Sequence, residues 1–524
     1  MMNPKKIKPA ETERRGILSR ISRSDFALAT ILCVAAALVA ILAFDPLPST
    51  IGDNAEFAIL GQALAHGLGY RYINHPDLRP ATKYPPGFPL LLAGWIRIFN
   101  EKIVSMKALV LVLFAGSILV AFHISRMLLE RWLALLAIGL VVSSWMVVNY
   151  SFQVLSDVPY MFFSLLGLLF LLRAETRWEA LLGGGISIWA YLTRTVGASL
   201  VVMAIVLLLV RRRRLEAGLI LISFVAVTVG WALRNYSLTG EGSRYLKLFL
   251  TANPVDPSAG RITFDGMLTR VWINFRDYVT FFISASFLPT VVSGWQSARG
   301  AVVGLSDLAR VVSALIMFVS VVGLYSLRRR AGFVILYMNL YFGVYLVWPE
   351  IWRTERFMVP IVPLVAVFFV RGIDRIISYF KVRRAVTRIV MIGLIIANLA
   401  SLVPFIHRSK GYPPGWYNYL QTALWARDNT PEGSVILCRK PFMYYIFSYR
   451  KTVGYPYTRD HEAMRRYLYE TNPDYIVIDN FGGGIGSTQV YLVPVLKQMP
   501  EAFDIIYRTD EPVNLLLKFN AERG

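Results

Sequence analysis

Charged side chains are scarce in this chain. Asp, Glu, Lys and Arg make up 17% of its 524 residues, whereas hydrophobic residues make up 56% and the mean hydropathy is +0.50. A soluble protein carries roughly 25% charged residues. Many apolar runs approach or exceed the roughly 18 residues that mark a spanning helix. The composition therefore excludes a soluble globular protein and predicts a polytopic α-helical membrane protein.

Cysteine is nearly absent. Cys33 lies in the first apolar run and Cys438 lies in the C-terminal region, so the sequence indicates no disulfide framework. The first apolar run is long and lacks a small-residue cleavage site. We therefore interpret it as a retained membrane anchor and not as a signal peptide.

Acidic residues are fewer than basic ones. The chain has 33 Asp and Glu residues and 55 Lys and Arg residues, and its net charge is +22. Such an excess can serve nucleic-acid binding. Here the basic residues cluster immediately beside apolar runs, at 211–214, 328–330 and 383–384. That is the positive-inside pattern of membrane proteins, in which basic loops also attract anionic lipids. We therefore expect membrane lipids as partners and no nucleic acid.

The apolar runs predict about eleven transmembrane helices. These predicted spans cover roughly residues 25–44, 104–122, 132–150, 154–173, 179–194, 196–212, 215–233, 311–327, 331–348, 357–371 and 386–406. The basic segment 1–24 places the N-terminus in the cytoplasm, and an odd number of spans then places the C-terminal region outside. The expected location is the cell inner membrane.

The membrane core 25–406 is expected to expose two long loops outside, residues 45–103 and 234–310, and the segment 411–524 follows the last span. That last segment contains helix-like and strand-like runs at 417–428, 434–438, 460–470, 474–479 and 515–518. Strand-like and helix-like runs in this order are typical of an α/β domain. We predict a small extracytoplasmic α/β domain at the C-terminus.

Two acids in the first outside loop are the most informative residues. Asp53 and Glu56 stand three apart before an amphipathic segment, residues 57–68, that is too short to span the bilayer and should lie along its surface. Acids held where bilayer meets water are well placed to act on a substrate with a lipid tail. The same spacing is typical of a capping box at a helix start. Both roles stay open, because a capping residue can be catalytic.

Further polar residues stand near these acids in the predicted topology. Lys83 and Tyr84 precede a Pro-Pro-Gly sequence, which makes a rigid turn, and Lys83 is either a solvated loop charge or a phosphate ligand. Four charged residues lie at span ends on the same predicted side: Asp157, Arg194, Arg353 and Arg356. Each alone is explained by snorkelling to water. Together, acids and cations facing one cavity are suited to hold a sugar and a phosphate.

These motifs resemble the GT-C superfamily of glycosyltransferases, and most of all its bacterial members similar to protein O-mannosyltransferases and lipid A aminoarabinose transferases. The matching stretches are residues 53–70, 83–92, 155–160, 190–195 and 355–363. The resemblance covers roughly residues 25–405. The C-terminal segment resembles the periplasmic domains of such enzymes only in its placement.

The resemblance implies a polyprenyl-phosphate-linked sugar donor and a lipid, glycan or protein acceptor of the cell envelope, met at the outer face. Asp53 matches the catalytic acid, and Asp157 matches the acid that opens the fourth span. Lys83 matches a basic residue that meets the donor phosphate. Glu56 departs from relatives in which the two acids are adjacent.

No cofactor is expected. His66, His75 and His123 are scattered and form no metal-binding pattern. The resemblance leaves room for a divalent cation, but the sequence indicates none.

We hypothesise that Asp53 accepts the proton of the acceptor hydroxyl as a general base. Lys83, Arg194, Arg353 or Arg356 would stabilise the leaving phosphate. The main alternative is a transporter or flippase of lipid-linked glycans. It predicts charges near mid-span and internal pseudo-symmetry, neither of which the sequence displays. A third alternative is a scaffold that binds glycan through its C-terminal segment, which leaves the loop acids unexplained except as a cap.

Overall fold

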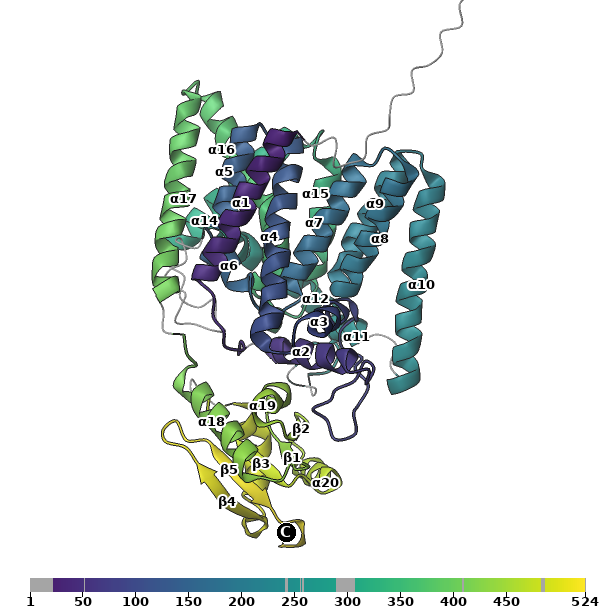
Figure 1. Cartoon of the computed structure of the whole chain (residues 1–524), viewed down its shortest axis with the longest axis vertical. Coiled ribbons are helices and arrows are strands. Elements are labelled where there is room, and N and C mark those ends of the chain that lie inside the picture. The colour runs from purple at the N-terminus through teal and green to yellow at the C-terminus, as the bar shows by residue number, and fades with distance from the viewer. Residues whose placement is uncertain are drawn as a thin grey trace, which may run out of the picture.

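The computed structural model describes residues 22–523 except 51, 241–243, 255, 257–258, 289–306, 408–409 and 482–485. The chain forms a large helical domain and a smaller C-terminal domain below it (Figure 1). The basic segment on which the expected orientation rests lies mostly outside the described residues, and the orientation stays a prediction.

The helical domain contains the elements from α1 to α17. They are α1 (Arg23–Leu42), α2 (Gly52–Ala65), α3 (Gly87–Ile98), α4 (Ile103–Leu128), α5 (Arg131–Val142), α6 (Trp145–Tyr150), α7 (Asp157–Arg173), α8 (Arg177–Thr193), α9 (Ala198–Val210), α10 (Arg214–Thr239), α11 (Arg244–Leu250), α12 (Phe264–Asp277), α13 (Ile283–Phe287), α14 (Asp307–Leu327), α15 (Gly332–Leu346), α16 (Val362–Tyr379) and α17 (Arg384–His407).

Six of the described helical segments are long and apolar enough to cross a membrane: α1, α4, α10, α14, α16 with the turn before it, and α17. Four shorter apolar helical segments accompany them. Long helices expose large apolar side chains, such as Ile31 on α1 and Phe318 on α14, as lipid contact requires. The polytopic helical class is confirmed, whereas the count of eleven spans stays a prediction.

Two predicted spans differ in shape from the expectation. The run 132–150 is divided into α5 and α6 at two serines, where the Ser143 hydroxyl donates to the carbonyl of Leu140 and the Ser144 hydroxyl donates to that of Ser286. These bonds give the backbone local alternatives to a continuous helix. The segment Glu355–Ile361 is a 3₁₀ helix that contains Pro360, so the regular helix α16 begins only after it.

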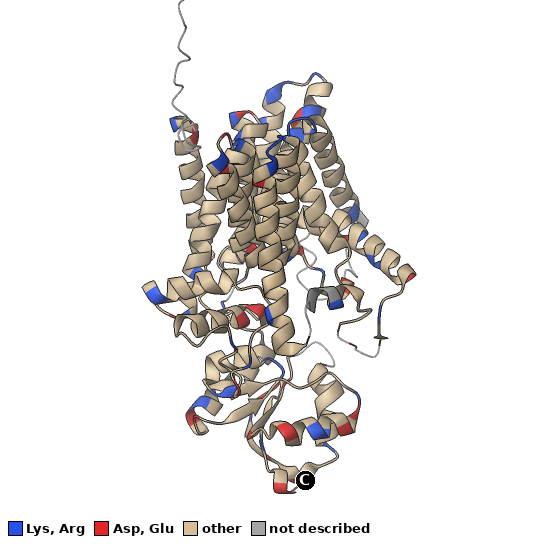
Figure 2. Ribbon diagram, turned by 90° about the vertical axis from the view of Figure 1, so that its right-hand side faces the viewer, with Lys and Arg blue, Asp and Glu red and all other residues tan. Residues whose placement is uncertain are grey.

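The short helices α2 and α3 lie across one end of the long helices, on the side of the C-terminal domain (Figure 1). Many Lys and Arg residues gather at the opposite end, as Figure 2 shows. The first loop and the C-terminal domain therefore share one side of the helical domain, as the predicted topology requires.

The C-terminal domain is built on a five-stranded sheet of order β2-β1-β3-β5-β4. The strands are β1 (Val435–Leu437), β2 (Lys451–Val453), β3 (Tyr475–Ile478), β4 (Phe503–Arg508) and β5 (Leu515–Phe519). β2, β1 and β3 are parallel, and β5 and β4 are antiparallel to their neighbours. The helices are α18 (Pro414–Asn429), α19 (Pro441–Ser448), α20 (His461–Thr471) and α21 (Val493–Leu496). The predicted small C-terminal sheet is confirmed.

The predicted strand-like runs include β1, β3 and β5, which form the centre of the sheet, but not β2 or β4. Both missed strands are edge strands. β2 has three residues, too few for a periodic pattern, and β4 is half-exposed along its length. Only buried central strands carry the continuous apolar runs that a sequence reveals.

The C-terminal domain docks on the first loop through hydrogen bonds. The Thr452 N–H donates to the carbonyl of Asn74 at 2.7 Å, and the Asn74 amide donates to the Thr452 hydroxyl at 3.1 Å. The Lys451 ammonium donates to the carbonyl of Ile73 at 2.8 Å. Phe442 on α19 packs against Tyr72 of the loop, with ring centroids 5.2 Å apart. The domain therefore covers the loop that carries the two acids.

Candidate active site

Helix α2 brings Asp53 and Glu56 to the end of the long helices. It packs tightly on α3, because a Cβ atom at Gly61 would lie 2.7 Å from Cβ of Leu92. Its other face packs under the C-terminal domain, where Ala55 belongs to the same apolar cluster as residues of α18 and α19. Helix α2 is thus held between two layers, and its first turn is fixed in place.

Asp53 accepts hydrogen bonds from two segments distant in sequence. Its Oδ1 accepts a bond from the Tyr84 hydroxyl at 2.7 Å and lies 3.6 Å from Nζ of Lys83. Its Oδ2 accepts a bond from Nη2 of Arg356 at 3.1 Å. Burial alone would raise the pKa of this carboxyl group, but the charges of Lys83 and Arg356 outweigh burial and hold its pKa well below the usual range.

Glu56 is more deeply buried than Asp53. Its Oε2 accepts a hydrogen bond from Nζ of Lys83 at 2.7 Å, and its Oε1 accepts one from the Tyr72 hydroxyl at 2.8 Å. Its side chain is 2% exposed, whereas those of Asp53 and Lys83 are 26% and 34% exposed. Burial would lower the pKa of Lys83, but the two carboxylates raise it above the usual value. Of these three side chains, Asp53 and Lys83 are the ones that a substrate can reach.

The capping-box alternative is not seen in the structure. Among the described residues, the carboxylates of Asp53 and Glu56 bond to the side chains of Tyr84, Arg356, Lys83 and Tyr72 and not to N–H groups of the first turn of α2. Helix α2 itself begins at Gly52, one residue before Asp53. The acid spacing therefore serves the contacts with other segments.

Asp157 stands at the first turn of α7 and is almost fully buried, with 1% of its side chain exposed. Its Oδ1 lies 2.5 Å from Nη1 of Arg194, which follows α8, and its Oδ2 lies 3.4 Å from Nε of Arg356. Arg356 therefore joins Asp53 to Asp157. Arg194 also donates a hydrogen bond to the Tyr345 hydroxyl on α15 at 3.2 Å.

We name these connected side chains the ion-pair cluster. Its members are Asp53, Glu56, Asp157, Lys83, Arg194 and Arg356. The cluster has as many basic as acidic groups, so it is neutral overall. Arg353 is not joined to it by any contact among the described residues, and pairs instead with Asp277 at 2.8 Å.

The Pro-Pro-Gly turn positions Lys83 and Tyr84. A Cβ atom at Gly87 would lie 2.6 Å from the backbone carbonyl of Leu192, so only glycine permits this approach. Leu192 lies near the end of α8, just before Arg194. The turn thereby brings the Lys83 segment against the helix end that supplies Arg194 to the ion-pair cluster.

Several residues near the site are not among those predicted from the sequence. Tyr72 binds Glu56. Asp277, the last residue of α12, binds Arg353, and it lies in a region whose sequence has no clear periodicity. Lys440 comes from the C-terminal domain. Burial and the neighbouring charge of Arg439 lower its pKa below the usual value, and the charges of Asp53 and Lys83 act on it as well. No sequence signal links residue 440 to residue 53.

The described residues include no group of three or more His, Cys, Asp or Glu side chains arranged to hold a metal ion. The acids of the ion-pair cluster are instead separated by Lys and Arg, to which their oxygens bind.

Comparison with protein families gives a match to part of the chain. Residues 83–232 match the family model described as dolichyl-phosphate-mannose-protein mannosyltransferase. The match includes Lys83, Tyr84, Asp157 and Arg194 and ends before Arg353 and Arg356. A comparison of the sequence with curated proteins found no match.

Comparison with solved structures shows the fold. The chain is similar to ArnT from Cupriavidus metallidurans, with a TM-score of 0.57 and 13% identity over 93% of this chain and 97% of that one. ArnT has also been solved bound to undecaprenyl phosphate. The chain is similar as well to the oligosaccharyltransferase of Archaeoglobus fulgidus, with a TM-score of 0.51 and 12% identity over 85% of this chain and 67% of that one. That enzyme has been solved with an inhibitory peptide and a dolichol-phosphate.

Proposed function

We propose that the chain is a membrane glycosyltransferase of the GT-C superfamily that transfers a sugar from a polyprenyl-phosphate donor to a lipid, glycan or protein acceptor. The family match and the similar solved structures support this proposal. Transfer takes place at the end of the helical domain that carries α2 and the C-terminal domain. The proposed location is the inner membrane, with this end facing outside.

One observation carries this proposal. Asp53, a partly exposed carboxylate, stands at the end of the long helices within hydrogen-bond reach of an arginine and beside a lysine, and both cations come from other segments. Transfer from a sugar phosphate requires a base for the acceptor hydroxyl and cations that stabilise the leaving phosphate, and both are present here.

In the proposed reaction, Asp53 accepts the proton of the acceptor hydroxyl while the oxygen of that hydroxyl attacks the anomeric carbon of the donor sugar. The bond between that carbon and the phosphate oxygen breaks, and polyprenyl phosphate leaves with the electron pair. Lys83 and Arg356 stabilise the negative charge on the phosphate. Direct displacement inverts the anomeric centre. If the acceptor is itself a phosphate, no base is needed and Asp53 positions the acceptor.

The low pKa of Asp53 links donor binding to catalysis. A carboxylate held by two cations is a weak base, because general-base strength follows pKa. A bound donor phosphate attracts Lys83 and Arg356 and weakens their hold on Asp53. The pKa of Asp53 then rises toward its ordinary value, so the base gains strength only when the donor is in place.

The other members of the ion-pair cluster act as positioning residues in this proposal. Glu56 holds Lys83, and Asp157 holds Arg356 and Arg194. The Tyr84 hydroxyl orients Asp53. Arg353 pairs with Asp277, whereas Arg356 bonds to Asp53 itself, which makes Arg356 the better placed cation.

The test is the variant Asp53→Asn, which keeps the shape of the side chain and removes the base. The purified protein in proteoliposomes receives labelled undecaprenyl-phosphate sugars, with membrane lipid and cell-wall fractions of a deletion strain as acceptors. We expect acceptor-dependent sugar transfer by the wild type and at least about 100-fold slower turnover by the variant.

The matched control is Asp77→Asn, which makes the same change at a 69%-exposed residue of the same loop. It should transfer sugar at the wild-type rate, and both variants should still insert into the membrane and fold. A near-wild-type rate of Asp53→Asn removes Asp53 from the mechanism. If the protein is a flippase or a scaffold, neither the wild type nor the two variants will transfer sugar. That result would contradict the glycosyltransferase proposal as a whole.

A further inference from the structure

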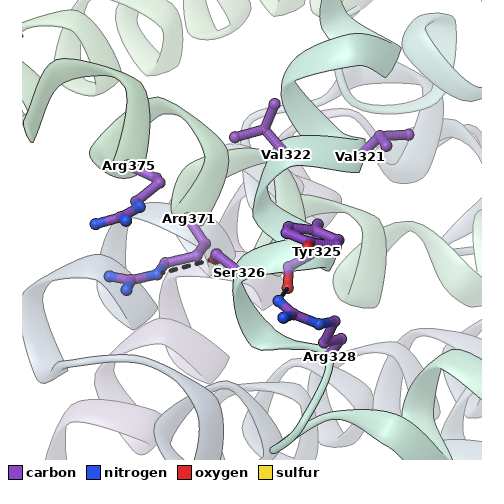
Figure 3. A pocket seen from close by; sticks show the side chains of 7 residues that line it. All are labelled: Val321, Val322, Tyr325, Ser326, Arg328, Arg371 and Arg375. Atoms are coloured by element: carbon purple, nitrogen blue, oxygen red, sulfur yellow. Dashed lines mark hydrogen bonds between the residues drawn. The ribbon is translucent and has the colours of Figure 1, made fainter. Parts of the chain in front are cut away.

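A cationic cavity of about 520 Å³ lies between α14 and α16, away from the ion-pair cluster. We name it the α14–α16 cavity (Figure 3). Its lining residues are Val321, Val322, Tyr325, Ser326, Arg328, Arg371 and Arg375. Arg356 precedes α16 and Arg371 lies midway along it, so a helical rise places them roughly 20 Å apart. The cavity thus lies toward the end of the helical domain opposite the C-terminal domain.

Two glycines explain why a cavity exists here. A Cβ atom at Gly323 would lie 1.8 Å from the carbonyl oxygen of Phe368, and one at Gly372 would lie 1.9 Å from that of Val319. The backbones of α14 and α16 therefore touch at this crossing. Helices that cross in contact diverge on either side of the crossing, and the lining side chains stand within about one turn of it.

The side chains of the cavity are held in place. Arg371 donates from Nε to the Ser326 hydroxyl at 3.3 Å and from Nη1 to Asp374 at 2.8 Å. Arg328 donates to the carbonyl of Tyr325 at 2.8 Å, and its guanidinium lies 3.9 Å from the centre of that ring. Figure 3 shows the bonds from Arg371 to Ser326 and from Arg328 to Tyr325, with Arg375 on the helix that carries Arg371.

The charges of the cavity do not balance. Three arginines face one acid within bonding distance, Asp374, which pairs with Arg371. Among the described residues, neither Arg328 nor Arg375 forms an ion pair with an acid. This differs from the ion-pair cluster, where acidic and basic groups are equal in number, and it favours an anionic ligand.

The cavity adjoins a surface suited to acyl chains. On α14, Phe318, Val321 and Tyr325 are 61%, 55% and 64% exposed, and this helix is long and apolar enough to span a membrane. An anionic head that enters the cavity can therefore lay its hydrocarbon chains along α14. Arginines that merely snorkel to water need neither the hydroxyl and ring contacts nor the converging positions seen here.

We propose that the α14–α16 cavity binds the phosphate head of an anionic phospholipid. The phosphate lies between Arg328, Arg371 and Arg375, and the acyl chains cover the exposed apolar face of α14. Basic pockets between transmembrane helices bind lipid heads of this kind. The inference is independent of the proposed enzyme activity, because it concerns other residues and needs no turnover.

The experiment compares two double variants of equal charge. In Arg328→Gln with Arg375→Gln, two cations of the cavity are removed. In Arg329→Gln with Arg330→Gln, two neighbouring cations that do not line the cavity are removed. Each purified protein is titrated with fluorescent phosphatidylglycerol in neutral lipid nanodiscs, and retained lipid is measured by native mass spectrometry.

We expect about 30-fold weaker phosphatidylglycerol binding by the cavity variant and less than about threefold weakening by the control. Equal weakening by both variants shows attraction to bulk charge and overturns the proposal, as does unchanged binding by the cavity variant. Millimolar inorganic phosphate is added as a competitor. Displacement of the lipid by this ion would show a free-anion site and also overturn the lipid assignment.

Discussion

At the scale of single residues, the ion-pair cluster balances its charges without a substrate. Breaking one buried pair costs about 3–5 kcal/mol, because the remaining charge is left without a partner. A donor phosphate therefore has to compete with Asp53 for Lys83 and Arg356. The cations Lys83 and Arg356 set the pKa of Asp53, so the pH dependence of the rate reports on its ionisation.

The first prediction concerns the pH dependence of the rate. The depressed pKa keeps Asp53 ionised as pH falls, so wild-type kcat/KM should stay flat from about pH 7 to about pH 5. In Lys83→Met one cation is lost, and the pKa of Asp53 rises toward about 3.9. The acid limb of kcat/KM should move to higher pH while the residual rate falls.

The measurement is the pH profile of sugar transfer by both proteins. Lys102→Met is the control, since Lys102 is an exposed residue beyond α3. An acid limb at the same pH in wild type and Lys83→Met would show that Lys83 does not set the basicity of Asp53.

At the scale of elements, the site depends on close approaches between segments. The Gly87 turn touches the end of α8, and Gly61 lets α2 lie against α3. These contacts fix where the first-loop acids stand relative to Arg194. Glycines in a membrane protein sequence suggest close packing, but no pattern in the sequence identifies the partner of each one.

The second prediction concerns Gly87→Ala. The added methyl group meets the backbone of Leu192, and overpacking of this kind costs about 1–3 kcal/mol. We expect a lower unfolding temperature in detergent and slower sugar transfer, because the turn and Lys83 are pushed away from α8.

Gly94→Ala is the matched control, because it makes the same change on α3 where nothing lies within 4 Å. It should leave both the unfolding temperature and the transfer rate unchanged or slightly raise the former. If Gly87→Ala behaves like Gly94→Ala, the close approach does not position the site.

At the scale of the whole molecule, the C-terminal domain covers the loop that carries the site. It docks on the first loop through Asn74 and Thr452, and the charges of Asp53 and Lys83 act on its residue Lys440. The charges of the ion-pair cluster itself balance. We therefore expect Lys440 to help bind the charge that a phosphate substrate adds.

The third prediction concerns Lys440→Met. Removing this charge should raise KM for the polyprenyl-phosphate sugar about tenfold and leave kcat closer to the wild-type value. Because burial lowers the pKa of Lys440, its charge is lost as pH rises sooner than that of an ordinary lysine near about pH 10.4. Wild-type affinity for the donor should fall on the alkaline side, and the variant should lack this decline.

Steady-state kinetics at several pH values measure both effects. Lys497→Met, at an exposed lysine of the same domain, should behave as the wild type. If Lys440→Met keeps the wild-type KM and the same alkaline profile, the C-terminal domain contributes no charge to donor binding.

The amino-acid sequence by itself determined the membrane class, many of the helical segments and the central strands, since these follow from apolar runs and their periodicity. It also singled out the acids and most of the cations, through their order along the chain. Only the tertiary structure decided that Arg356 joins Asp53 to Asp157 and that Arg353 pairs elsewhere. The physical reason is that ion pairs act through space over a few ångströms, and residues far apart in the sequence leave no local pattern that reveals their contact.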